Sequence, residues 1–130
     1  MNTEWSLDLG RTNRAWEGLS DLCCEAYDNA VEHGFHVAHD KLREICKANE
    51  VEELAEITIR LEMLAKIGSE VGEAVSAVQH GDEEAMHEEL ADVVIRIFDM
   101  AGALNINLAS HVISKMQKNR LRPYLHGKKC

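Results

Sequence analysis

Aromatic residues, proline and long apolar runs are all scarce in this chain of 130 residues. Phe, Trp and Tyr together make up 5% of it and Pro123 is the only proline, whereas Ala, Leu, Glu and Met are plentiful. This composition predicts an all-α domain, because the aromatic strand formers are few. No apolar run approaches the roughly 20 residues that cross a bilayer, and the first ten residues lack a basic and apolar leader. We therefore expect a cytoplasmic protein without a membrane partner.

The chain also lacks a Cys-x-x-Cys motif and has no acidic residue near its C-terminal end. The four cysteines form no Cys-x-x-Cys motif, which disfavours a zinc or thioredoxin-type site and favours reduced thiols. The net charge of −9 disfavours a nucleic-acid polymer as partner. Two interpretations remain for the charge separation along the chain: attraction between a basic tail and an acidic body, or a polyanion site. No Asp or Glu follows Asp99, and the last segment holds Lys115, Lys118, Arg120, Arg122, Lys128 and Lys129.

Hydrophobic periodicity and capping signals predict one domain over residues 1–130, built as a four-helix-type bundle with its core at about 21–120 and a basic tail at 121–130. Extension of the first helix back to Thr12 and a short helix at 40–48 stay open. Asn49 and Asp82 are the expected N-caps of the second and third helices. The four helices are expected at 21–33, 51–79, 82–104 and 108–120.

The long helix at 51–79 is apolar on two sides, which a single small bundle does not need. We expect one side to face the core, namely Ile57, Leu61, Leu64, Gly68, Val71, Val75 and Val78. We expect the other side at a subunit interface, namely Ile59, Met63, Ile67, Ala74 and Ala77. The chain is therefore predicted to complete its bundle as a homo-oligomer.

Two pairs of carboxylates recur with the same spacing on consecutive helices. Glu70 and Glu73 lie three residues apart on the long helix, and Glu89 and Asp92 repeat this spacing on the next. If these helices pack antiparallel through a turn at Gly81, the four groups converge, and such an oxygen-rich site suits Mg²⁺, with Mn²⁺ as a substitute. The alternative is that they are ordinary solvated residues on helix surfaces, because the ExxE spacing is common in helices.

The segments 66–74 and 88–93, Lys-Ile-Gly-Ser-Glu-Val-Gly-Glu-Ala and Glu-Glu-Leu-Ala-Asp-Val, resemble the ExxE and ExxD motifs of the MazG-like nucleotide pyrophosphohydrolases. The 15 residues between Glu73 and Glu89 fit the usual gap of that signature. Residues 115–123, which begin with a Lys-x-x-x-Asn motif, are similar to the family's phosphate-binding segment. The resemblance covers roughly residues 60–129. It implies a single all-α MazG-like domain that is active as a dimer or a dimer of dimers.

The resemblance also implies an activity and a set of site residues. The activity is metal-dependent hydrolysis of (deoxy)nucleoside triphosphates to the monophosphate and pyrophosphate, with a house-cleaning role in the nucleotide pool. The implied metal ligands are the four paired carboxylates, and the implied catalytic residues are Glu70, Glu73 and Lys115. The resemblance places Lys115 and Asn119 beside the phosphates and Phe35 near the base. Two further substrate contacts are assigned by helical phase and by charge, namely Arg122 and Lys128.

One position departs from the family pattern. Ser69 stands where many members carry a glutamate that is a candidate for positioning the attacking water, which leaves that role open. Two alternative functions therefore remain: a non-catalytic helical oligomer with the same fold, and a phosphoribosyl-ATP pyrophosphohydrolase, which shares it. Arg96 is expected to form an ion pair with Asp92, one turn earlier, and contact with a phosphate is the alternative.

Histidine recurs every three residues in one short stretch, at His33, His36 and His39. A zinc site is disfavoured there, because Gly34 interrupts the helix that this spacing would need. Phe35, in the same stretch, either fills the core or stacks on a nucleotide base.

Overall fold

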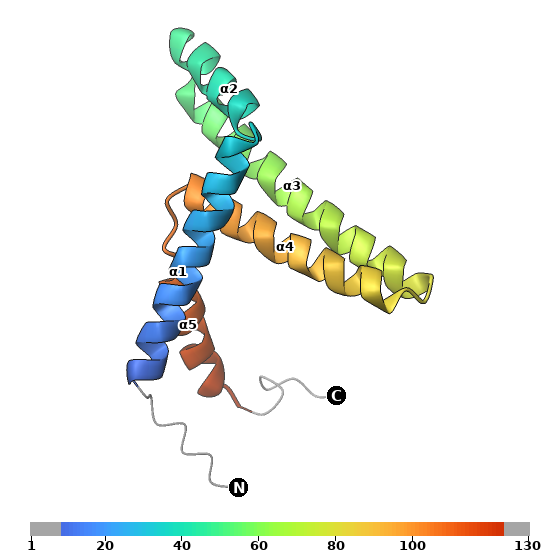
Figure 1. Ribbon diagram of the computed structural model, residues 1–130. Helices are drawn as coiled ribbons and strands as arrows, with labels where there is room; N and C mark the ends of the chain where they lie inside the picture. Colours follow the sequence, from blue (N-terminus) through green and yellow to red (C-terminus); the bar gives the residue numbers. More distant parts are fainter. Residues whose placement is uncertain (1–8, 124–130) are drawn as a thin grey trace, which may run out of the picture.

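Five α-helices and no strand make up residues 9–123, the part of the chain that this computed structural model describes (Figure 1). The predicted all-α class is confirmed, and the first helix extends back beyond Thr12. The short helix left open at 40–48 is also present. The helices are α1 Leu9–Glu32, α2 Val37–Ala48, α3 Glu52–Gln79, α4 Glu83–Ala103 and α5 Leu108–Arg120.

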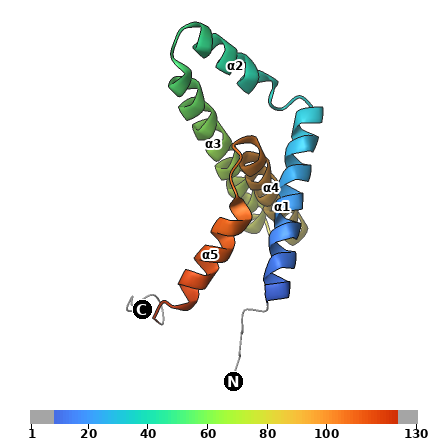
Figure 2. The ribbon, with the colours of Figure 1, turned by 90° about the vertical axis from the view of Figure 1, so that its left-hand side faces the viewer.

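The helices pack in pairs rather than as one closed four-helix bundle. α3 and α4 form an antiparallel hairpin, α1 crosses α4, α2 packs on α3, and α5 packs on α1. Figures 1 and 2 show that the hairpin extends away from α1 on one side, and that α2 and α5 lie at opposite ends of α1. Many apolar side chains therefore stay exposed in the single chain.

Within the described helices, none alone has the length and apolar character needed to span a membrane. Only α4 and α5 taken together pass that test, and they are bent by 118° where they meet.

Helix ends follow the local sequence closely at the α3–α4 turn. Gly81 adopts a φ of +70°, a left-handed conformation that glycine tolerates best. Asp82 then caps α4, because its side chain accepts a hydrogen bond from the backbone N–H of Ala85 at 3.0 Å, as predicted. The predicted capping role of Asn49 is wrong: its side chain donates to the carbonyl oxygen of Ile45 at the end of α2, and α3 begins without a side-chain cap.

The crossing of α1 and α4 depends on a glycine. A Cβ added to Gly102 would lie 2.5 Å from Cβ of Tyr27 and 3.1 Å from the carbonyl oxygen of Cys23. No larger residue fits at this distance without movement of α1. Small buried residues on both helices, Cys23, Ala30 and Ala101, allow the same close approach.

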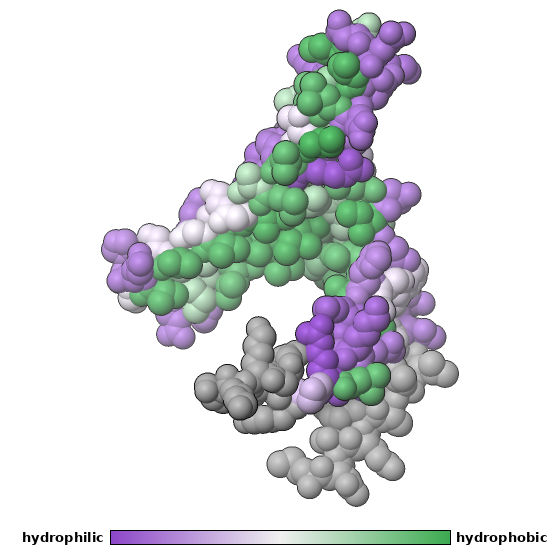
Figure 3. Space-filling view, turned by 180° about the vertical axis from the view of Figure 1, so that it is seen from behind, coloured by the Kyte–Doolittle hydropathy of each residue, from purple (hydrophilic) through white to green (hydrophobic). Residues whose placement is uncertain are grey.

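The side of α3 that is buried within the chain is not the one predicted to face the core. Ile59 and Met63 are 1% and 6% exposed, and Ile59 is the one large side chain that is fully buried among the described residues. The side predicted to face the core is exposed instead, with Leu61 at 63% and Val78 at 62%. The reason is that α2 and α4 both pack on the Ile59 side of α3. Figure 3 shows that apolar side chains cover the other face of the hairpin.

Candidate active site

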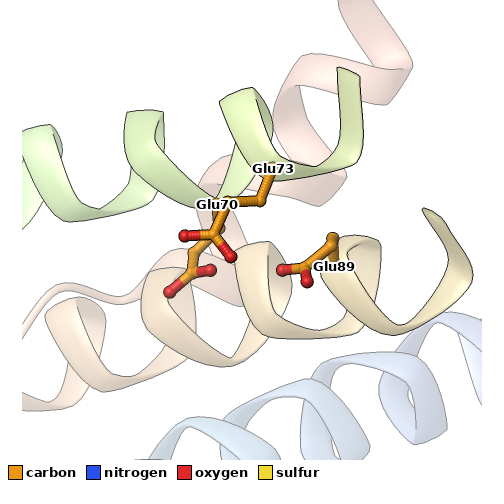
Figure 4. Close-up of side chains that lie close together, drawn as sticks. All are labelled: Glu70, Glu73 and Glu89. Carbon is orange, nitrogen blue, oxygen red and sulfur yellow. The ribbon is translucent and has the colours of Figure 1, made fainter. Parts of the chain in front are cut away.

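Three of the four predicted metal ligands come together between α3 and α4 (Figure 4). Glu70, Glu73 and Glu89 each offer one carboxylate oxygen, and these oxygens lie within 4.8 Å of one another. The spacing of three residues places the first two on adjoining turns of α3, and the antiparallel hairpin brings the third opposite them. Glu70 is buried, Glu89 is half-buried and Glu73 is exposed.

Asp92, the fourth predicted ligand, lies outside this group of three and lines the adjoining cavity. Its charge still acts on the cluster. The pKa of Glu89 is raised, first by loss of hydration and then by the negative charges of Glu73, Glu70 and Asp92. All four carboxylates therefore share one electrostatic environment, although their roles as metal ligands stay a prediction.

Arg96 pairs across the helix interface rather than along its own helix. Its Nε donates a hydrogen bond to Oε1 of Glu70, so the predicted ion pair with Asp92 is wrong. The Glu70 side chain is only 10% exposed, whereas Asp92 is exposed. The buried carboxylate has the greater need of a counter-charge, because burial removes its hydration.

A cavity of about 270 Å³ opens beside the carboxylates, between α1, α3, α4 and the turn before α2. Its wall carries both charges as well as aromatic and apolar groups, so it suits a polar ligand that also has a flat or apolar part. The side chains that line it include Asn29, Phe35, His36, His39, Met63, Lys66, Glu70, Asp92, Ile95, Arg96 and Asp99.

Two histidines of this wall each donate to a carboxylate. Nε2 of His36 lies 2.7 Å from Oδ1 of Asp99. Nε2 of His39 donates to Glu62, whose other oxygen lies 2.6 Å from Nζ of Lys66. These hydrogen bonds, that from Lys66 first, lower the pKa of Glu62 and so favour its ionised form.

Sequence reasoning did not assign His36, His39 or Asp99 to the site. A signal for Asp99 was present, because Asp92, Arg96 and Asp99 recur at i, i+4 and i+7 and so share one face of α4. The histidines become part of the cavity only through the turn between α1 and α2, where Gly34 has a φ of +77°. No periodicity within one helix predicts that arrangement.

Phe35 lies in this turn at the edge of the cavity, and its side chain is 66% exposed. A core-filling role within the single chain is therefore wrong. His33 is turned to α1, where its Nδ1 lies 2.8 Å from the carbonyl oxygen of Asn29. Among the described residues, no metal-binding group of three contains the three histidines.

Within the described residues, the side chains predicted to hold phosphates, Lys115, Asn119 and Arg122, do not line this cavity. Lys115 and Asn119 lie on α5, and Arg122 follows its end. α5 packs on α1, and its first turn is tied there by a hydrogen bond of 3.0 Å from Trp16 to Ser110. Lys128 lies outside the described residues. The substrate-binding roles of these four residues stay predictions.

A helical hairpin that gathers carboxylates beside a cavity with charged groups in its wall defines a class of all-α proteins suited to cation-assisted chemistry on a charged ligand. The model of the MazG nucleotide pyrophosphohydrolase domain matches residues 59–125, and the chain belongs to this family. Its fold is thus the MazG-like fold, and the match indicates nucleotide pyrophosphohydrolase activity. No curated protein and no solved structure matches the chain.

The matched segment holds every carboxylate of the cluster, whereas the cavity wall from α1 and the following turn lies before it. The donor set fits a hard divalent cation, because it consists of carboxylate oxygens gathered within 4.8 Å of one another. Arg96 offsets only part of their negative charge.

Proposed function

We propose that this protein hydrolyses (deoxy)nucleoside triphosphates to the monophosphate and pyrophosphate with Mg²⁺, or with Mn²⁺ in its place. Removal of unwanted nucleotides from the cytoplasmic pool is the corresponding role. The observation that carries this proposal is the convergence of Glu70, Glu73 and Glu89 beside a cavity with both charged and apolar groups in its wall, within the segment that matches the family.

Hydrolysis breaks the bridging P–O bond between the α- and β-phosphates. The oxygen of a water molecule bonds to one of these two phosphorus atoms, the monophosphate separates from pyrophosphate, and a base must accept a proton from the water. Bound by Glu70, Glu73, Glu89 and Asp92, Mg²⁺ would offset the negative charge of the phosphates. Glu73 is the most exposed of the three clustered carboxylates, and we assign the proton from water to the oxygen of Glu73 that the cation would leave free. The hydroxyl of Ser69 is far too weak a base for this task. The hydrogen bond from Arg96 fixes the position of Glu70 and so orients its carboxylate in the cluster.

Lys115 and Asn119 are the proposed phosphate contacts, with Arg122 and Lys128 beside them. The hydrogen bond from Trp16 fixes α5 to the first half of α1, and the cavity begins at Ala26, about 15 Å further along that helix. A second copy of the chain is the natural source of these groups, because its α5 is not tied to this α1. This assignment therefore requires an oligomer.

The exposed face of α3 supports pairing with a second copy. Its apolar residues alternate in steps of three and four, which is the heptad spacing of helices that pair as coiled coils. Gly68 lies within this seam, and nothing lies within 4 Å of the position of its Cβ, so a partner helix has room there. We therefore place the interface of a dimer, or of a dimer of dimers, on this seam: Leu54, Ile57, Leu61, Leu64, Gly68, Val71, Val75 and Val78.

The test is release of pyrophosphate from a panel of nucleoside triphosphates, with Mg²⁺ or with EDTA. Glu89→Gln is expected to lower kcat by about 100-fold or more, because it removes a charge from the cluster. Glu88→Gln is the matched control, because Glu88 is the exposed neighbour of Glu89 and lies outside the cluster. Full activity of Glu89→Gln, with no response to EDTA, would overturn the proposal.

The same panel tests the alternatives. Hydrolysis of phosphoribosyl-ATP in preference to every nucleoside triphosphate would identify the other pyrophosphohydrolase. No release of pyrophosphate from any of these compounds would favour the non-catalytic helical oligomer.

A further inference from the structure

The two ends of the cavity differ in chemistry. Asp92, Arg96 and Asp99 line it in succession along α4, over about 10 Å. The Asp92 end adjoins the carboxylate cluster, where the phosphates belong under the proposed function. The Asp99 end is bounded by α1 and by the turn that carries Phe35 and His36. These two ends match the two chemically distinct ends of a nucleotide.

Asp99 is held as an oriented hydrogen-bond acceptor. Nε2 of His36 donates to its Oδ1 at 2.7 Å, and the His36 side chain is only 9% exposed. The ring of His36 is held in turn by an edge contact with Tyr27, with centroids 5.2 Å apart. Across residues 9–123, Oδ2 of Asp99 has no hydrogen-bond partner, and the side chain keeps 20% exposure. A ligand in the cavity therefore meets a fixed acceptor with spare capacity.

The surroundings of Asp99 suit a flat ligand. Phe35 presents an exposed ring at the edge of the cavity, and stacking on such a ring tolerates every base. His39 lies in the same wall, and its Nδ1 is buried without a hydrogen-bond partner in the described part of the chain. Natural proteins rarely leave a buried polar atom unpaired in a wall that serves packing alone.

The size of the cavity agrees with partial enclosure of a nucleotide. Pockets that enclose a whole drug-sized molecule hold about 300–1,000 Å³. The cavity of about 270 Å³ lies just below this range, so it encloses one end of a nucleotide and leaves the other end at the carboxylates.

We propose that the Asp99 end is the nucleobase subsite and that Asp99 selects bases with an exocyclic amino group. This inference rests on the proposed function, because it names the substrate class of the same site. The amino group of adenine, cytosine or guanine donates to the free oxygen of Asp99. In uracil or hypoxanthine a carbonyl oxygen replaces the amino group of cytosine or adenine, and it would face the carboxylate as acceptor against acceptor.

Two matched pairs of substrates test this selection, dCTP with dUTP and ATP with ITP. We expect kcat/KM to favour the amino-bearing member at least tenfold, as a site built to accept one hydrogen bond does. Asp99→Asn, whose amide also donates, is expected to reduce this preference at least tenfold. Asp21→Asn, an exposed position on α1, is the control and keeps it. Equal use of both members by the native protein, or an unchanged preference in Asp99→Asn, would overturn the inference.

Two further variants separate selection from affinity. Phe35→Ala is expected to lower kcat/KM equally for both members of each pair, because stacking does not read the base edge. His36→Gln keeps the carboxylate and removes the ring that orients it, so the preference is expected to fall in part. Circular dichroism confirms that each variant folds, and His36→Gln replaces Asp99→Asn as the deciding variant if the latter does not.

Calorimetric binding of dCMP and dUMP makes the test independent of turnover. Tighter binding of dCMP that depends on Asp99, in a protein that hydrolyses no nucleotide, would uphold the subsite and refute the proposed function. Hydrolysis of nucleotides together with equal binding of dCMP and dUMP would refute the subsite and uphold the function.

Discussion

Arg96 Nε donates to Glu70 Oε1 across the interface of α3 and α4, and leaves Asp92 on its own helix without that cation. The Glu70 side chain is 10% exposed and that of Arg96 is 43% exposed, so the carboxylate lies inside and the guanidinium reaches solvent. Arg96 therefore supplies some of the positive charge that a divalent cation would bring to the cluster.

Replacement of Arg96 by leucine is expected to lower the free energy of unfolding by about 2–3 kcal/mol in EDTA, because Glu70 is then buried without a counter-charge. Mg²⁺ should restore part of this loss, since a cation bound to the cluster takes over the missing charge. Urea unfolding with and without Mg²⁺ measures both effects. Arg14→Leu, at an exposed position of α1, is the control. Equal losses in the two variants would contradict the role of the pair.

Lys115→Ala is expected to lower kcat/KM about tenfold or more, which corresponds to at least about 1.4 kcal/mol of transition-state stabilisation. The loss should be the same for every base, because a phosphate contact carries no information about the base. Steady-state kinetics on the nucleotide panel measure it. Lys118→Ala is the comparison, because its side chain lies about 60° around α5 from that of Lys115. A loss confined to Lys118→Ala would show that the wrong face of α5 was assigned.

Leu61→Glu is expected to dissociate the protein into monomers, because it places a charge in the middle of the exposed seam of α3. Leu121→Glu changes an apolar residue that is 88% exposed beyond α5, and it should leave the assembly intact. Sedimentation velocity at micromolar concentration distinguishes the two. A native protein that sediments as a folded monomer of 14.6 kDa would refute the interface.

Gly102→Ala is expected to lower the free energy of unfolding by about 1–3 kcal/mol, because its methyl group would overlap Tyr27. This loss outweighs the gain of about 1 kcal/mol that alanine brings inside a helix. Gly18→Ala has nothing within 4 Å of its Cβ, and it should therefore show the gain alone. Opposite shifts of the urea midpoint are the expected result, and a stabilised Gly102→Ala would show that α1 and α4 cross less tightly.

The ion pair of Arg43 and Glu56 predicts a pH dependence of stability. Nε of Arg43 donates to Oε1 of Glu56 at 2.8 Å, and this hydrogen bond lowers the pKa of Glu56 below its ordinary 4.5. A lowered pKa in the folded state contributes stability above the unfolded value, and that stability is lost as pH falls through the folded value. Arg43→Gln should therefore cost up to about 1 kcal/mol at pH 7 and almost nothing below the folded pKa of Glu56.

Chemical denaturation at pH 7 and in acid measures this difference, with Lys41→Gln as an exposed control on the same helix. A difference in free energy of unfolding between native protein and Arg43→Gln that is the same at pH 7 and in acid would contradict the assignment.

The parts of the fold that depend on neighbouring residues were predictable from the sequence. Gly81 and Asp82 mark the end of α3 and the start of α4, because a left-handed turn and a cap need particular residues at particular positions. The carboxylate pairs follow from the same local periodicity once the two helices are antiparallel.

Features that depend on which surfaces meet were not predictable in this way. Periodicity shows that α3 has two apolar sides, but it does not say which one packs within the chain, and Ile59 rather than Leu61 is buried. Arg96 could pair with Asp92 on its own helix or with Glu70 across the interface, and it pairs with Glu70 because that carboxylate is buried. The His36–Asp99 contact joins residues 63 positions apart, beyond the reach of any local pattern.

The left-handed turn at Gly81 fixes how far the sequence between the two acidic motifs can vary. Each residue added to one arm of the hairpin turns every later side chain by about 100° and shifts it by about 1.5 Å. An insertion of one residue near Gly81 would therefore aim Glu89 away from Glu70 and Glu73 while leaving both helices intact. Where added residues continue the helices, the cluster is kept only when both arms grow together by whole helical turns, which is about seven residues in total. The gap of 15 residues thus fixes where Glu89 lies relative to Glu70 and Glu73, and only certain other lengths of helical arm would keep the three together.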